Sequence, residues 1–157
     1  MSTMKTTKQL TPEVALDRLQ SLCARAEHST AEVREKLRRW GISGQDSEDI
    51  INRLVSSRYI DDSRYAKAMV NDKVKFARWG RRKIEQALYT RGINSSIIHQ
   101  ALDTIDPDLY EANLHAVLIA KSRALPQPLS YENRVKLYRH ALSRGYEPDL
   151  ISRAIKL

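Results

Sequence analysis

The segment LYTRGI at residues 88–93 has the form in which a helix ends: a last helical turn, then a glycine, then an apolar residue. Glycine readily takes the left-handed conformation that terminates a helix, and the apolar residue after it packs back onto the last turn. Two further segments have the same form, LRRWGI at 37–42 and ALSRGY at 141–146. The three segments together indicate an internal repeat.

The residues around each glycine support this repeat. Apolar residues stand eight and four positions before each glycine, which places them on one face of a helix; they are Val33 and Leu37, Ile84 and Leu88, and Leu137 and Ala141. A shorter helix with one apolar stripe is expected after each glycine, carried by Ile50, Ile51, Leu54 and Val55, then Ile97, Ile98, Ala101 and Leu102, then Leu150, Ile151, Ala154 and Ile155. A longer helix is expected before each of these pairs, near 12–26, 62–77 and 107–123.

The pattern predicts an all-α fold of three tandem three-helix repeats that form an elongated, curved molecule. We expect a flexible N-terminus at 1–11 and repeats at 12–57, 58–105 and 106–157. Strand-type alternation of apolar and polar residues does not occur in the sequence, so helix should far exceed the globular average of about a third. The second and third helices of each repeat have a helix-turn-helix outline, which occurs both in DNA-binding proteins and in helix packing without a partner.

The composition narrows the class of protein. The chain has 157 residues, 41% of them hydrophobic, and a single cysteine. No apolar run is long enough to cross a membrane, and the polar N-terminus does not resemble a secretory signal. One cysteine excludes an internal disulfide framework. We therefore expect a cytoplasmic protein that does not bind membranes. We also expect the protein to be a monomer.

The basic residues are concentrated in one stretch. The chain has 27 Lys and Arg against 19 acids, a net charge of +8, and residues 73–83 contain six basic and no acidic side chains. Such a run favours a polyanion such as DNA as partner. The candidate binding residues are Lys73, Lys75, Arg78, Arg81, Arg82 and Lys83. The aromatic residues Phe76 and Trp79 lie within the run, and two interpretations stay open: they stack on exposed bases, or they fill the joint between two helices.

A second basic cluster lies in the middle helix of the first repeat. Its candidate binding residues are Arg34, Arg38 and Arg39. Because Glu32 and Glu35 lie close by in the same helix, a solvated face of ion pairs explains the cluster equally well.

The sequence offers little support for catalysis. The four histidines are widely spaced and have no metal-ligand spacing, and no glycine-rich phosphate loop is present. Cys23 lies on an apolar helix face, as a core thiol does. Asp61 and Asp62 form an acidic pair that suits the start of the next helix better than a metal site. We expect no catalytic residues, no metal and no cofactor.

The second repeat contains three distinctive motifs, YIDDSRYA at 59–66, WGRRKI at 79–84, and Leu88 with Arg91-Gly92-Ile93. These motifs resemble the RecX family of bacterial RecA modulators. The resemblance extends to the first repeat through residues 29–37 and to the third through 136–145.

This resemblance implies three three-helix repeats and a regulatory protein that is not an enzyme. It implies partners too: the RecA filament and the single- and double-stranded DNA on which it acts, with inhibition of strand exchange, coprotease action and ATP hydrolysis. The basic surface of the family corresponds to Arg78, Arg81, Arg82 and Lys83. Two other classes remain open, a helix-turn-helix protein that binds duplex DNA without RecA and an adaptor that does not contact nucleic acid.

Overall fold

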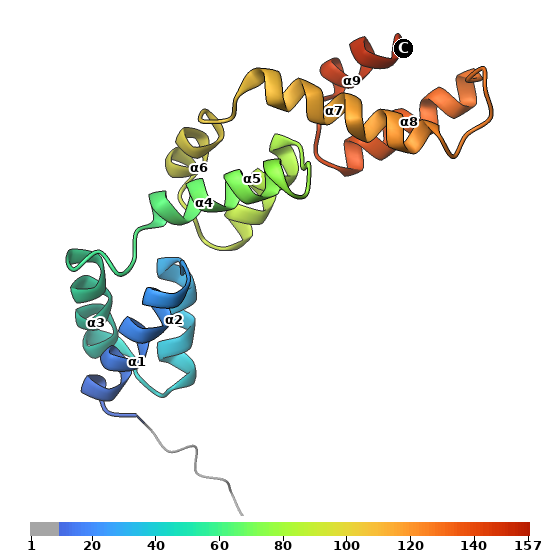
Figure 1. Cartoon of the computed structure of the whole chain (residues 1–157). Coiled ribbons are helices and arrows are strands. Elements are labelled where there is room, and N and C mark those ends of the chain that lie inside the picture. The colour runs from blue at the N-terminus through green and yellow to red at the C-terminus, as the bar shows by residue number, and fades with distance from the viewer. Residues whose placement is uncertain (1–9) are drawn as a thin grey trace, which may run out of the picture. The chain divides into compact units, whose positions relative to one another are not determined.

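The structure is a computed structural model that describes residues 10–157. This part of the chain forms nine α-helices and no strand, which confirms the all-α repeat fold (Figure 1). The helices are α1 (Pro12–Arg25), α2 (Thr30–Arg39), α3 (Gly44–Ser56), α4 (Asp62–Lys75), α5 (Arg81–Thr90), α6 (Ser95–Leu102), α7 (Pro107–Ser122), α8 (Tyr131–Ser143) and α9 (Pro148–Ile155). Most of the N-terminus predicted to be flexible, 1–11, lies outside the described residues; Thr11 is described and caps α1. None of the described helices is both long and apolar enough to span a membrane.

The helix ends follow the local rules on which the repeat was based. Gly41, Gly92 and Gly145 all have positive φ angles, of 78°, 75° and 97°, as predicted. The apolar pairs before them are buried in all three repeats. Side-chain oxygens of Ser29 and Ser130 accept hydrogen bonds from backbone N–H groups in the first turns of α2 and α8. Local sequence is therefore sufficient to set where these helices begin and end.

The described chain forms two compact units. The first holds α1, α2 and α3, the start of α4 as far as Tyr65, and the turn Arg91–Ile93. Helices α1 and α2 both pack on α3. Their core consists of Ala15, Leu19, Val33, Leu37, Ile42, Ile50, Ile51, Leu54 and Ile60. The predicted stripe of α3 was wrong at Val55, which is 49% exposed, and Ala26 is also exposed because α1 ends before it.

Polar contacts of the first unit join α2 to the start of α4 and to the 91–93 turn. The carboxylate of Asp62 accepts hydrogen bonds from the backbone N–H and the hydroxyl of Thr30, at 2.8 and 3.0 Å. The Tyr65 hydroxyl donates to Glu32 at 2.7 Å and accepts from the Arg91 guanidinium at 2.8 Å. These bonds explain why residues from the second repeat belong to this compact unit.

The second unit consists of Ala66–Thr90 and Asn94–Leu157. Helix α5 packs on α6, and α8 packs on both α7 and α9. Tyr110, the fourth residue of α7, corresponds to Tyr65, the fourth residue of α4. Its hydroxyl likewise contacts an acid and an arginine, since it donates to Glu147 at 2.6 Å and accepts from the backbone N–H of Arg81 at 3.0 Å. Each unit thus uses a tyrosine at the same repeat position to connect successive repeats.

Candidate nucleic-acid interface

The basic run at 73–83 covers the last turn of α4, the turn 76–80 and the first turn of α5, all within the second unit. Lys75, Arg78 and Arg82 are exposed. Their side chains have no hydrogen bond or ion pair to any residue in the described part of the chain. These three cations are therefore available to an anionic partner.

Two lysines of the run are placed by an aromatic ring. The ammonium groups of Lys73 and Lys83 each lie 4.6 Å from the centre of the half-buried Trp79 ring. Cations over an indole ring are attracted by its π-electron density, by about 0.5–1 kcal/mol at exposed sites. Trp79 therefore positions charge within the run, in addition to any packing it provides.

Phe76 has a different environment from Trp79. Its side chain is 83% exposed, so the interpretation that it fills a helix joint is wrong. Phe76 and Trp79 are only three residues apart, but the backbone between them leaves the helix after Lys75 and passes through Arg78, whose φ is 51°. The change of direction separates an exposed aromatic from a half-buried one.

Arg81 is the member of the run whose charge is paired with an acidic residue of the second unit. Its guanidinium lies 3.1 Å from a carboxylate oxygen of Glu147 and 4.0 Å from the centre of the Tyr110 ring. Burial, followed by the hydrogen bond to Glu147, raises the pKa of Tyr110 above its usual range. The charge of Arg81 is thus engaged in the contact between α5, α7 and the residue before α9.

The third repeat fixes the backbone of the turn 76–80. The Arg144 guanidinium donates to the carbonyl of Ala77, and the Tyr146 hydroxyl donates to the carbonyl of Arg78 at 2.7 Å. The backbone N–H of Gly80 donates to the carbonyl of Arg144 at 2.7 Å. Sequence reasoning missed these residues because they lie more than 60 positions from the turn. The signal in the sequence is Gly145, which both ends α8 and lies against Gly80.

A shallow groove of about 430 Å³ adjoins the basic run. Helices α5 and α8 and their flanking turns supply its lining, which is Trp79, Arg82, Lys83, Gln86, Ala87, Leu142, Ser143 and Gly145. The exposed lining of this groove is mainly apolar, and its two cations, Arg82 and Lys83, can contact phosphate groups. Such contacts position a nucleic acid without specifying its sequence.

The basic cluster of the first unit has acidic partners. Arg34 lies 3.3 Å from Glu48, and Arg38 donates two hydrogen bonds to Glu35, at 2.7 and 2.9 Å. Arg39 contacts the same carboxylate at 3.3 Å. Hydrogen bonding to Arg38 is the main reason that the pKa of Glu35 is lowered to about 2. The face of ion pairs, one of the two interpretations of this cluster, is therefore present. All three arginines nevertheless remain on the surface.

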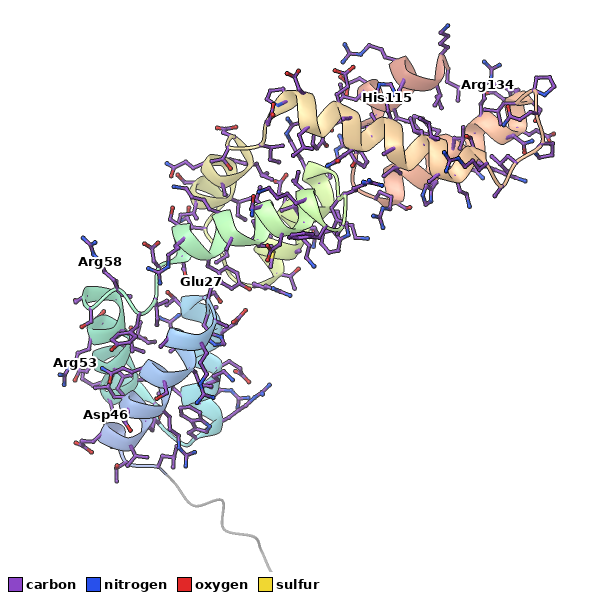
Figure 2. The ribbon with its side chains drawn as sticks, viewed as in Figure 1. Glu27, Asp46, Arg53, Arg58, His115 and Arg134 are labelled. Atoms are coloured by element: carbon purple, nitrogen blue, oxygen red, sulfur yellow. The ribbon has the colours of Figure 1, made fainter. Side chains whose placement is uncertain are left out.

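Cys23 and the acidic residues Glu27 and Asp61 have structural partners in the first unit. The described residues contain no group of three or more His, Cys, Asp and Glu able to hold a metal ion. Burial, and then the nearby Glu27 carboxylate, raises the pKa of the Cys23 thiol, which disfavours the reactive thiolate. Glu27, labelled in Figure 2, accepts a 2.6 Å hydrogen bond from Arg64, and Asp61 caps the start of α4 by accepting from the Arg64 backbone N–H. Asp61 thus has the predicted helix-capping role.

Comparison with known families agrees with this fold. Residues 15–54 match the family model of the RecX first three-helix domain, and residues 61–102 match that of the RecX second three-helix domain. These two ranges correspond closely to α1–α3 and α4–α6.

Two curated relatives carry the name "Regulatory protein RecX". The protein from Clostridioides difficile is 30% identical over 143 residues, which cover 86% of this chain and 63% of that protein. The protein from Vibrio parahaemolyticus is 33% identical over 135 residues, covering 85% of this chain and 84% of that protein. The chain thus spans less than two thirds of the first relative and most of the second.

A solved structure confirms the fold. The crystal structure of RecX from Lactobacillus salivarius has a TM-score of 0.85 and 21% identity, and the match covers 92% of this chain and 94% of that one. At this level of identity the match supports the fold alone. The two domain matches and the curated relatives show that the chain belongs to the RecX family.

Proposed function

We propose that this protein is a regulator that binds the RecA–DNA filament and inhibits the recombinase, coprotease and ATPase activities of RecA, and thereby regulates DNA repair. The observation that carries the proposal is the group of exposed, unpaired cations Lys75, Arg78 and Arg82 on a chain of the RecX family. These cations supply the electrostatic attraction to DNA, and the protein surface of the repeats supplies contacts to RecA. The protein acts as a binding partner and not as an enzyme.

In this proposal the repeats 12–57, 58–105 and 106–157 act together along the filament. The second repeat presents the basic run, and the third repeat holds the turn 76–80 in place through Arg144 and Tyr146. Linked repeats that bind at several points raise one another's effective concentration. The first-unit arginines Arg34, Arg38 and Arg39 contribute less, because each would have to give up a carboxylate partner to bind a phosphate fully.

The test is RecA ATP hydrolysis on single-stranded DNA, measured as the full chain is added. We expect inhibition with the wild-type chain, and little inhibition with a variant in which Lys75, Arg78 and Arg82 are replaced by alanine. The matched control replaces Arg34, Arg38 and Arg39 by alanine, which removes the same net charge from the other cluster. It should inhibit nearly as well as the wild type.

The two variants should also differ in the salt dependence of their DNA binding. The slope of log affinity against log salt should fall by about 0.7–0.9 for each phosphate that the first variant no longer binds, and it should change little in the control. No effect of the wild-type chain on RecA would refute the proposed function. DNA binding without an effect on RecA would instead support a helix-turn-helix protein that acts on duplex DNA.

A further inference from the structure

Phe76 is the most exposed of the large apolar side chains in the described part of the chain. Its ring has no contact with another aromatic ring or with a cation among the described residues. A single exposed apolar residue is ordinary on a protein surface. Phe76 differs from such residues in the charge of its neighbours in the sequence.

The sequence around Phe76 is strongly cationic. Residues 73–84 contain no Asp or Glu, and the unpaired cations Lys75, Arg78 and Arg82 lie within six residues of Phe76; the exposed Asp72 precedes this stretch. The centres of protein–protein contacts are depleted of lysine, whereas arginine and aromatic residues are enriched there. An aromatic ring among cations matches the surfaces that bind single-stranded nucleic acid, where bases stack on rings and cations follow the phosphates.

The backbone that carries Phe76 is already held in place. Its own N–H donates to the carbonyl of Asp72 at 2.9 Å, and the next two carbonyls, of Ala77 and Arg78, accept bonds from Arg144 and Tyr146. Tyr146 is completely buried, so this support is part of the core of the second unit. A pre-ordered turn loses little conformational entropy when it binds a ligand.

We propose that Phe76 stacks on an unpaired base of single-stranded DNA while Lys75, Arg78 and Arg82 contact the neighbouring phosphates. In a duplex the faces of the bases are covered by their neighbours, whereas an unpaired base has a free face for the ring. The inference rests on the DNA contact in the proposed function and deepens it: the partner of this turn is an unpaired strand.

The experiment compares the full-length wild type with Phe76→Ala and Phe76→Trp by equilibrium binding. The matched control is Tyr89→Ala, which removes a 68% exposed aromatic ring of α5 that lies outside the basic run. The probes are an oligodeoxythymidylate of about 20 nucleotides, long enough for such a site, and a strand of equal length with abasic sites throughout. Thermal unfolding of each variant checks that the fold is retained.

Phe76→Ala should weaken thymidylate binding by about 5- to 150-fold, the usual effect of losing one stacked base. It should leave binding to the abasic strand, which retains the phosphates, unchanged. Phe76→Trp should restore thymidylate binding, and Tyr89→Ala should alter neither. This pattern would support stacking, because a general loss of fold or charge would affect both strands.

The proposal would be overturned if the wild type bound the thymidylate strand no more tightly than the abasic strand and Phe76→Ala bound both strands as the wild type does. So would a Phe76→Ala variant that binds thymidylate normally but no longer inhibits RecA, since the ring would then contact a protein. A wild-type chain that binds neither strand would also overturn it. The proposed function is decided separately, by whether the wild-type chain inhibits RecA ATP hydrolysis.

Discussion

The backbone of Gly80 lies directly against the peptide of Gly145. A β-carbon at Gly80 would overlap the carbonyl carbon of Gly145, and one at Gly145 would lie 2.5 Å from the β-carbon of Lys83. This close approach lets the Gly80 N–H donate to the Arg144 carbonyl and the Arg82 N–H donate to the Gly145 carbonyl, at 2.7 and 3.0 Å. The two glycines therefore join the basic run to the end of α8.

Gly80→Ala should destabilise the chain by about 1–3 kcal/mol, the range typical of overpacking, because a methyl group would force the two backbones apart. Urea unfolding followed by circular dichroism measures the change. Gln86→Ala, at an exposed position of α5, is the control and should shift stability by less than about 0.5 kcal/mol. Equal stability of Gly80→Ala and the wild type would show that the junction yields easily.

Gly92→Val should destabilise by more than about 1 kcal/mol, since a β-branched residue resists a positive φ. A β-carbon there would also lie 2.8 Å from the β-carbon of Ala31. Gly44→Val separates the two effects, because Gly44 has a φ of 61° but open space around it. We expect the Gly92 variant to be the less stable of the two. If both variants are destabilised equally, the approach to Ala31 contributes nothing.

Arg81 and Arg82 should respond differently to the same substitution. Arg81→Ala removes a charged partner from the half-buried Glu147 and should cost about 1 kcal/mol or more of stability. Arg82→Ala removes a free surface cation and should instead weaken DNA binding without changing the unfolding midpoint. Denaturant unfolding and DNA binding at two salt concentrations give both quantities. If the two variants changed stability and DNA binding equally, the separate roles assigned to Arg81 and Arg82 would be contradicted.

Buried tyrosines should make the fold sensitive to alkaline pH. Burial raises the pKa of Tyr146 to about 12, and burial also raises the pKa values of Tyr65 and Tyr110. An unfolded tyrosine ionises near pH 10. Their contribution is therefore complete below about pH 10 and is lost as pH rises toward 12, because the unfolded chain releases these protons first.

The free energy of unfolding should accordingly fall between about pH 10 and 12, and Tyr146→Phe should make the fall shallower. Absorbance at alkaline pH should show some of the seven tyrosines ionising late in the folded chain. Ionisation of all of them together near pH 10, before unfolding, would contradict the prediction.

Several polar side chains have the predicted local position but bind partners that are distant in the sequence. Ser29 and Glu32 have the spacing of a capping box, and Ser29 does accept from the Glu32 N–H at 3.1 Å. The Glu32 carboxylate, however, binds Tyr65 and His28. Asp62 begins α4, as predicted, and its carboxylate also binds the first residue of α2. Local sequence allows a carboxylate either to cap its own helix or to bind another element. The partners that folding brings close to it decide which contact forms.

Sequence alone determined the all-helical repeat, the glycine-terminated middle helices and the position of the basic run, because caps, apolar periodicity and charge density depend on residues within a few turns of one another. Tertiary structure alone decided which cations of that run are free. Arg81 and Arg82 are adjacent and chemically identical, but successive residues of a helix point about 100° apart. Arg81 therefore faces Tyr110 and Glu147, and Arg82 faces solvent. The partners of Arg81 lie 29 and 66 residues away in the chain, and only folding brings them together.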